Sequence, residues 1–220
     1  MSESALESVP VAIRPLGLQG DLVAPPHAKG VVLFAHGSGS SRSSPRNRYV
    51  AAMLHEGGLA TLLMDLLTAN EEETDDITRE YRFNIGMLAE RLIQAAEWLA
   101  EQPTTGALDI GCFGASTGGG AALVAAAERP ELIRAVVSRG GRPDLAGPAL
   151  ARVTAPTLLI VGGRDRAVIE MNREAFAQLH CEKRLDIVPG ATHLFEEPGT
   201  LDEVARLARA WFGEHLRLRR

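Results

Sequence analysis

Three widely separated polar residues have the types needed for nucleophilic catalysis by a serine. Ser116 lies in the segment Gly114-Ala115-Ser116-Thr117-Gly118, after an apolar run and before a stretch of small residues, and Asp165 and His193 each follow a later apolar run. A serine hydroxyl becomes a good nucleophile when a histidine takes its proton and a carboxylate orients that histidine. The three residues therefore predict a catalytic triad for acyl transfer.

The glycines around Ser116 fit a sharp turn that leads from a buried strand into a helix. Such a turn holds the serine in a strained backbone conformation with its hydroxyl projecting outward. The spacing alone is weak evidence in a chain with 22 glycines, but the apolar run before it and the small residues after it supply the strand and the helix. A phosphate-binding loop is the alternative, and the segment lacks the glycine spacing and the lysine that such loops require.

The carboxylate and the base each have an ordinary structural alternative. Asp165 also fits the N-cap of a helix that begins at Arg166. A histidine is most often a surface or structural residue, but His193 follows a strand and a Pro-Gly turn, which lets it reach the serine turn. Four other histidines are predicted to be surface or structural residues: His27, His55, His180 and His215.

Backbone amides that stabilise a tetrahedral oxyanion are expected from two segments. One is the amide of Thr117, directly after the serine, and the other is the amide of Ser38, in the loop after the apolar run 30–35. His36 lies in the same loop, but no second histidine at ligand spacing and no paired-cysteine motif accompanies it, so we expect it to brace the loop. No metal is predicted.

Several arginines lie near these loops. Each is predicted to be a surface or structural charge, and recognition of an anionic substrate group is the alternative; they are Arg42, Arg46, Arg48, Arg139 and Arg142.

Short apolar runs alternate with helical patterns, which is typical of an α/β fold with a mostly parallel sheet and helices on both faces. The first two strands are too close for a crossover helix, so they should form an antiparallel hairpin at one edge, and the other six should run parallel. The predicted strands are 9–14, 20–24, 30–35, 60–65, 108–113, 135–138, 157–161 and 184–188.

Helices are predicted at 47–55, 77–101, 118–128, 166–180 and 201–215. The acidic segment 71–76 is interpreted as a solvated loop that leads into the second of these helices. Fewer than about twenty residues separate the strands that end at 138 and begin at 157, which leaves no room for a folded lid, given that domains have at least about 50 residues.

Composition restricts the other function classes. The 220 residues are 45% hydrophobic and 23% charged, which suits a single domain over 1–220, and the net charge of −5 argues against nucleic-acid or anionic-membrane partners. No apolar run approaches the roughly 20 residues that cross a bilayer. The N-terminus shows no secretory signal, so we expect a cytoplasmic protein in which Cys112 and Cys181 are free thiols.

The chain resembles the α/β-hydrolase superfamily, and specifically its dienelactone-hydrolase-like group, from about residue 9 to 215. The resemblance is carried by four segments in register: His36-Gly37-Ser38-Gly39, Gly114 to Gly118, Gly162 to Asp165 and Gly190 to His193. The resemblance implies an eight-stranded sheet, minimal or no cap, and hydrolysis without a cofactor or metal. The family's dienelactone hydrolases proper use a cysteine nucleophile, whereas Ser116 occupies that position here.

The sequence therefore predicts a serine hydrolase that acts on a small carboxylic ester or lactone, as a monomer or small homo-oligomer. Two alternatives stay open. One is a catalytically silent binding protein on the same scaffold, and the other is an acyltransferase or perhydrolase whose acyl acceptor is not water.

Overall fold

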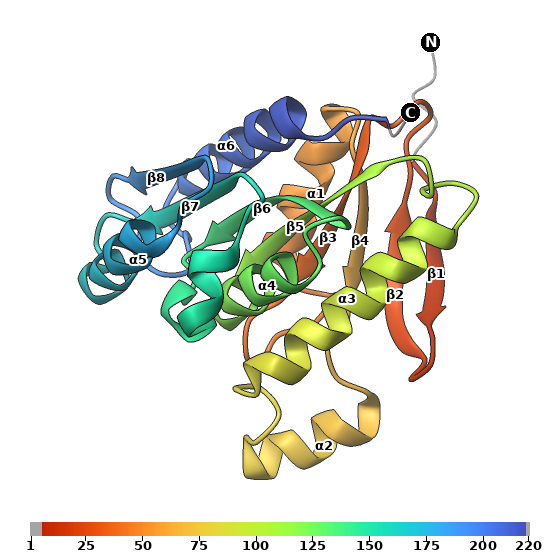
Figure 1. The fold of residues 1–220 in the computed structure, drawn as a ribbon, viewed down its shortest axis with the longest axis horizontal. Coiled ribbons are helices and arrows are strands. Elements are labelled where there is room, and N and C mark those ends of the chain that lie inside the picture. Colours follow the sequence, from red (N-terminus) through yellow and green to blue (C-terminus); the bar gives the residue numbers. More distant parts are fainter. Residues whose placement is uncertain (1–5, 219–220) are drawn as a thin grey trace.

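The computed structural model describes residues 6–218, in which strands and helices alternate (Figure 1). The strands are β1 Ser8–Ile13, β2 Leu18–Val23, β3 Gly30–Ala35, β4 Ala60–Met64, β5 Asp109–Ala115, β6 Ile133–Arg139, β7 Thr157–Gly162 and β8 Lys183–Val188. The α-helices are α1 Pro45–Glu56, α2 Ala69–Thr78, α3 Ile85–Glu101, α4 Thr117–Glu128, α5 Arg166–Gln178 and α6 Thr200–His215, and a 3-10 helix, η1, covers Pro143–Arg152.

The strands form one eight-stranded sheet in the order β1-β2-β4-β3-β5-β6-β7-β8. β1 and β2 form the predicted antiparallel hairpin at one edge, β2 pairs antiparallel with β4, and β3 to β8 run parallel to one another. The predicted fold class is therefore confirmed. Because parallel strands end at the same side of the sheet, the loops that follow β3, β5, β6, β7 and β8 lie along one rim.

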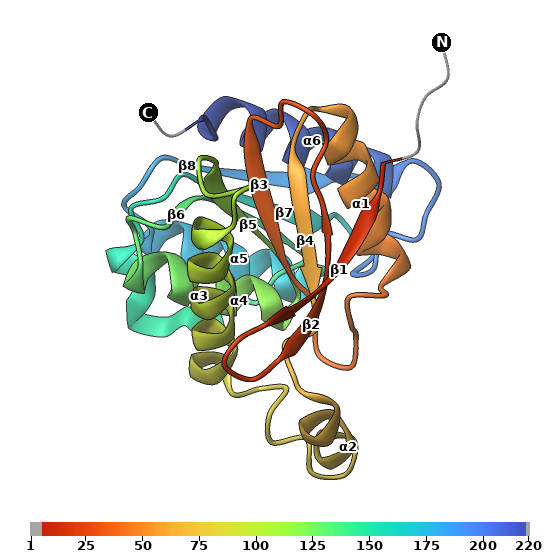
Figure 2. The same ribbon diagram turned by 90° about the vertical axis from the view of Figure 1, so that its right-hand side faces the viewer.

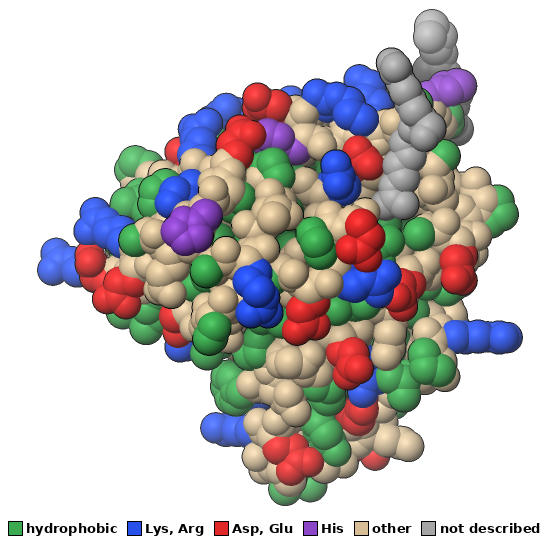
Figure 3. Space-filling model, viewed as in Figure 1, with side chains coloured by type: hydrophobic (Ala, Val, Ile, Leu, Met, Phe, Trp, Pro, Cys, Tyr) green, Lys and Arg blue, Asp and Glu red, His purple; other side chains and the backbone are tan. Residues whose placement is uncertain are grey.

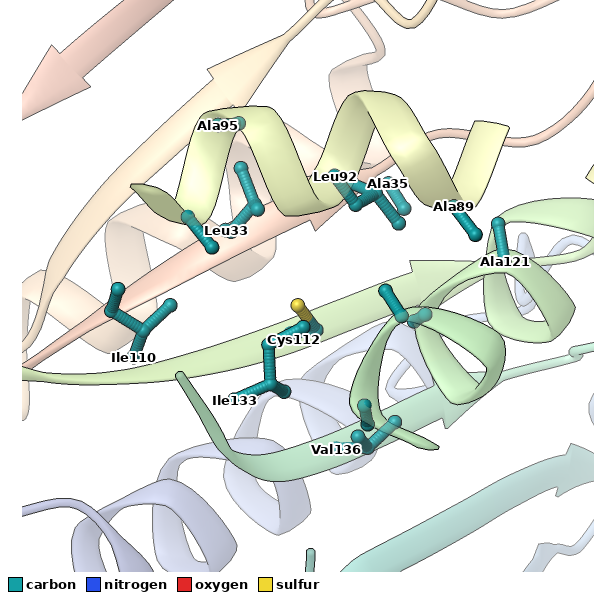
Figure 4. Packing of buried hydrophobic residues seen from close by; sticks show 14 of the residues in the cluster. Leu33, Ala35, Ala89, Leu92, Ala95, Ile110, Cys112, Ala121, Ile133 and Val136 are labelled. Carbon is teal, nitrogen blue, oxygen red and sulfur yellow. The ribbon is translucent and has the colours of Figure 1, made fainter. Parts of the chain in front are cut away.

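Alternate side chains of the central strands pack into different cores. On β3, Val31 and Leu33 join the cluster under α3 and α4, while Val32 and Phe34 join the cluster under α1 and α6. Figure 2 shows the sheet between these two helical layers, and Figure 4 shows α3 and α4 packed over β3, β5 and β6. This two-sided burial fixes the central strands, and with them the loops that follow these strands along the rim.

The single helix predicted over 77–101 is wrong, as is the predicted acidic loop 71–76. The acidic residues lie in α2, which starts with a capping box between Thr68 and Glu71. The chain then turns before α3 because the buried Asp75 carboxylate accepts hydrogen bonds from the backbone N–H groups of Tyr81 and Arg82 and pairs with the Arg82 side chain. In Figures 1 and 2, α2 projects from one end of the molecule.

The connection from β6 to β7 contains only η1, and no cap domain is evident in residues 6–218. Within that described range, none of the helices combines the length and apolarity needed to span a bilayer. On the face seen in Figure 3, acidic and basic side chains are interspersed, in agreement with the small net charge.

Candidate active site

Ser116 lies at the predicted turn, between the end of β5 and the start of α4. Its backbone has φ 51° and ψ −121°, a region that non-glycine residues rarely adopt. Its N–H donates to the carbonyl of Arg139 at 3.2 Å, and its carbonyl accepts from the Arg142 N–H at 3.0 Å. The start of the β6–η1 loop therefore holds the strained residue in place from both sides.

Two glycines allow the chain to pass so sharply between strand and helix. A Cβ on Gly114 would lie 2.4 Å from the carbonyl oxygen of Gly118, and a Cβ on Gly118 would lie 2.3 Å from that of Ala35. Both contacts are with backbone, which cannot yield as a flexible side chain does. The glycine pattern is therefore a packing requirement of this turn.

Asp165 and His193 are in contact although 28 residues separate them. The loop after β7 meets the loop after β8, where the Arg164 N–H donates to the Ala191 carbonyl, and His193 Nδ1 lies 2.6 Å from Asp165 Oδ2. An ionised carboxylate only accepts, so Nδ1 carries the proton and donates it, which leaves Nε2 as an acceptor. Asp165 occupies the N-cap position of α5, but its side chain makes no capping hydrogen bond. The contact favours the role of histidine-orienting acid over that of helix cap.

Ser116 and His193 line one cavity of about 250 Å³, together with Gly37, Ser38 and Leu194. The cavity opens at the rim formed by the carboxyl ends of the parallel strands. Ser116 is partly exposed there, as is His193. The structure thus places the three predicted triad residues at one site, with a direct contact between the acid and the base and a shared cavity between the base and the serine.

The two segments predicted to supply oxyanion donors lie side by side, because β3 pairs with β5. The Ser38 N–H donates to the Thr117 hydroxyl at 3.0 Å. This hydrogen bond ties the β3 loop to the start of α4, where the Thr117 amide lies at the positive end of the helix. For the Ser38 amide to stabilise an oxyanion, its N–H must either donate to the oxyanion and the Thr117 hydroxyl together or release the hydroxyl.

His36 braces the β3 loop, as expected. Its Nε2 accepts from the Leu66 N–H at 3.0 Å, and its Nδ1–H donates to the Gly37 carbonyl at 2.9 Å. Burial lowers the pKa of His36, so the ring stays neutral. A neutral ring with both nitrogens occupied is a support for the loop that carries Ser38.

Neither cysteine is a better candidate for a nucleophile than Ser116. Cys112 is fully buried on β5, and burial raises its pKa to about 12. Burial also raises the pKa of Cys181, which lies just before β8. A thiol that stays protonated is a poor nucleophile.

Arg139 is not a surface charge, which was one of the two roles expected for it. It is 7% exposed, it lines the cavity beside Ser116, and no hydrogen bond or ion pair within residues 6–218 accounts for its guanidinium. Arg46, from the first turn of α1, lines the same cavity. The sequence offered one signal, since Arg139 lies between the predicted strand 135–138 and two consecutive glycines.

The described residues contain one cluster with metal-ligand geometry, formed by Glu182, Glu214 and His215. Both glutamates are exposed, and the cluster lies where β8 begins and α6 ends. This is the opposite rim of the sheet from Ser116, so the cluster is not part of the candidate active site.

Comparisons with known proteins show which family and fold this chain shares. The model of the dienelactone hydrolase family matches residues 18–213. The crystal structure of a dienelactone hydrolase from Anabaena variabilis ATCC 29413 is 62% identical, has a TM-score of 0.94, and covers 98% of this chain and 100% of its own. Est1E from Butyrivibrio proteoclasticus, at 18% identity and a TM-score of 0.75, covers 94% of this chain and 98% of its own and shares the fold.

Two curated relatives come from Mycobacterium tuberculosis, strains CDC 1551 and H37Rv, and both bear the name "Putative phosphoribosyl transferase". Each is 58% identical over 210 residues, which are 96% of this chain but 46% of the relative. This chain therefore spans about half the length of the curated relatives that it matches. From the family match over residues 18–213, this chain belongs to the dienelactone hydrolase family.

Proposed function

We propose that this protein is a serine hydrolase that cleaves a small carboxylic ester or lactone through an acyl-enzyme intermediate. The observation that carries the proposal is the 2.6 Å contact between His193 Nδ1 and Asp165 Oδ2, beside a cavity that His193 shares with Ser116. This contact orients the imidazole so that the other ring nitrogen, Nε2, is free to act on the serine.

In the proposed mechanism, His193 Nε2 takes the proton of the Ser116 hydroxyl while Ser116 Oγ attacks the acyl carbon. Asp165 stabilises the imidazolium that results. The proton then passes from His193 to the leaving alkoxide as the bond between the acyl carbon and the alcohol oxygen breaks. Water, activated by the same histidine, attacks the acyl-enzyme and releases the acid. In a lactone, the alcohol stays tethered to the acyl group as the ring opens.

The Thr117 amide is the best-placed donor for the oxyanion. It follows the nucleophile directly, and its helix, α4, adds the field of twelve aligned residues. The Ser38 amide is the proposed second donor, once it shares its hydrogen bond to the Thr117 hydroxyl.

The name of the two M. tuberculosis relatives refers to proteins more than twice as long as the matched region. It therefore does not fix the reaction of the part that this chain covers. The family match and the 62% identical crystal structure of a dienelactone hydrolase both favour hydrolysis. Because Ser116 replaces the cysteine of dienelactone hydrolases proper, we propose ester or lactone hydrolysis in general rather than dienelactone as the substrate.

A chain-length series of 4-nitrophenyl esters tests this function. A cavity of about 250 Å³ admits a compact acyl group, so we expect hydrolysis of the acetate and butyrate esters. For the octanoate and longer esters, kcat/KM should be at least about tenfold lower, which is the size of effect expected when one good apolar contact is lost. Each rate is compared with that of the Ser116→Ala protein. The proposal would be ruled out if the wild-type protein hydrolysed no ester or lactone faster than that variant does, or if it preferred long acyl chains.

A further inference from the structure

The histidine of the proposed triad lies on a loop, and its own side chain makes too few contacts to fix its position. His193 belongs to the segment 189–199, which connects β8 to α6, and its side chain is 39% exposed. Within residues 6–218, its ring makes one hydrogen bond, to Asp165. This bond sets the orientation of the ring but not the place of its backbone. The reach of Nε2 toward Ser116 therefore depends on what holds the loop.

The peptide unit that joins Ala191 to Thr192, directly before the histidine, is bound on both sides. Its carbonyl accepts from the N–H of Arg164 at 2.9 Å, in the loop that carries the acid of the proposed triad. Its N–H donates to Glu197 Oε2 at 3.0 Å. A hydrogen bond to an ionised acceptor is stronger than one to a neutral acceptor. The loop of the acid and the Glu197 carboxylate thus hold this peptide unit between them.

The residue that supplies this carboxylate is attached to the core. The backbone carbonyl of Glu197 accepts from the N–H and the hydroxyl of Thr200, at 3.1 and 2.7 Å, and Thr200 is the buried first residue of α6. Phe195, two residues earlier, places its ring in the core under α1 and α6. Its φ of 56° is rare for a residue other than glycine and costs energy, which burial of the ring offsets. Glu197 therefore joins the histidine loop to the core and to α6.

The two adjacent acids of this loop differ in what they contact. Glu197 is ionised at neutral pH, because its hydrogen bond with Thr192 is the largest cause that lowers its pKa, and the charge of Arg164 lowers it further. Glu196 is 64% exposed and pairs with Arg46 instead of with the loop backbone. Glu197 is not among the described residues that line the candidate active-site cavity. It can act on the reaction only through the loop.

We propose that Glu197 is a positioning residue for His193. Its carboxylate holds the peptide unit before His193 against the loop of Asp165, and this keeps Nε2 within reach of the Ser116 hydroxyl. The proposal rests on the proposed function of this site. Because a misplacement of about 1 Å can lower the rate of an enzymatic reaction about a hundredfold, loss of this hydrogen bond should be visible in turnover.

Three variants test this role by their kinetics on the preferred ester. Glu197→Ala should lower kcat about ten- to a hundredfold and change KM less than about twofold, since the residues around the substrate stay in place. Glu197→Gln keeps an oxygen that accepts from the Thr192 N–H, so its kcat should stay within about threefold of wild type. The control Glu203→Ala removes an acid of α6 whose carboxylate pairs with Arg206, and it should keep the wild-type kcat.

The kinetic outcomes separate positioning from other roles. Glu197 is partly exposed, so all three variants should fold, and Tm measurements set an assay temperature well below the lowest value. An equal loss of kcat in Glu197→Ala and Glu197→Gln would show that the hydrogen bond to Thr192 is not the cause. An increase in KM with unchanged kcat would assign Glu197 to substrate binding. Either result would overturn the proposal.

Proton NMR of the inactive Ser116→Ala protein separates this proposal from the proposed function. The proton between His193 Nδ1 and Asp165 should give a sharp downfield resonance, assigned by its loss in His193→Ala. Addition of Glu197→Ala to Ser116→Ala should broaden or remove it, and addition of Glu197→Gln should retain it. That result, in a wild-type protein that hydrolyses no ester or lactone, would refute the proposed function alone. A resonance that Glu197→Ala leaves unchanged would overturn the positioning role, whatever the esterase activity.

Discussion

Ser116→Ala is expected to lower kcat for the preferred ester by about 10⁴- to 10⁶-fold. The substitution removes the atom that forms the acyl-enzyme and leaves water as the only nucleophile. The remaining activity would come from binding and from the oxyanion donors. Alanine takes the place of a partly exposed serine whose backbone contacts are unchanged, so the variant should fold and melt close to wild type.

Ser43→Ala is the matched control. Ser43 is an exposed serine in the loop between β3 and α1, outside the cavity. Its kcat and KM should equal those of wild type. A loss of less than about tenfold in Ser116→Ala, far below the loss expected on removal of the nucleophile, would mean that another group attacks the acyl carbon.

Gly118→Ala is expected to destabilise the protein by about 3 kcal/mol or more, at the upper end for overpacking, and to abolish activity. The added methyl would lie 2.3 Å from the Ala35 carbonyl oxygen and 2.7 Å from that of His36. Because both atoms are backbone, relief requires α4 to move away from β3. That movement also displaces Thr117 and Ser116. Chemical denaturation, followed by far-UV circular dichroism, measures the change in the free energy of unfolding.

The same substitution at Gly213 provides the control. Gly213 lies inside α6, and no atom lies within 4 Å of the position that its Cβ would take. Gly213→Ala should therefore raise the free energy of unfolding by roughly 0.5–1 kcal/mol, through helix propensity alone. Equal effects of the two substitutions would mean that the close approach of α4 to β3 does not constrain the nucleophile turn.

The sequence predicted the features that follow from local rules. A serine between glycines after an apolar run, and an acid and a histidine after later runs, were sufficient to place Ser116, Asp165 and His193 at one rim, because parallel strands end on the same side of a sheet. The hairpin at the edge followed from the short connection between the first two strands. Each of these inferences needs only the neighbours of a residue along the chain.

The features that the sequence did not reveal depend on contacts between distant residues. The turn between α2 and α3 exists because a buried Asp75 binds Arg82. The helical periodicity of the sequence does not show this turn and predicts a continuous helix instead. The unpaired state of Arg139 requires knowledge of every side chain around it. Whether the Ser38 amide is free depends on the Thr117 hydroxyl. The single-domain organisation, the cytoplasmic location and the oligomeric state stay predictions.

Covalent labelling with a fluorophosphonate tests the central claim most directly, because the reagent reacts with a serine only when a neighbouring base activates it. Intact-mass measurement and peptide mapping of the wild-type protein should show one adduct, on Ser116. Labelling should be absent in Ser116→Ala and at least about a hundredfold slower in His193→Ala, which lacks the base. A folded wild-type protein that takes up no label, or takes it up at another residue, would contradict the assignment of Ser116, His193 and Asp165 as one catalytic unit.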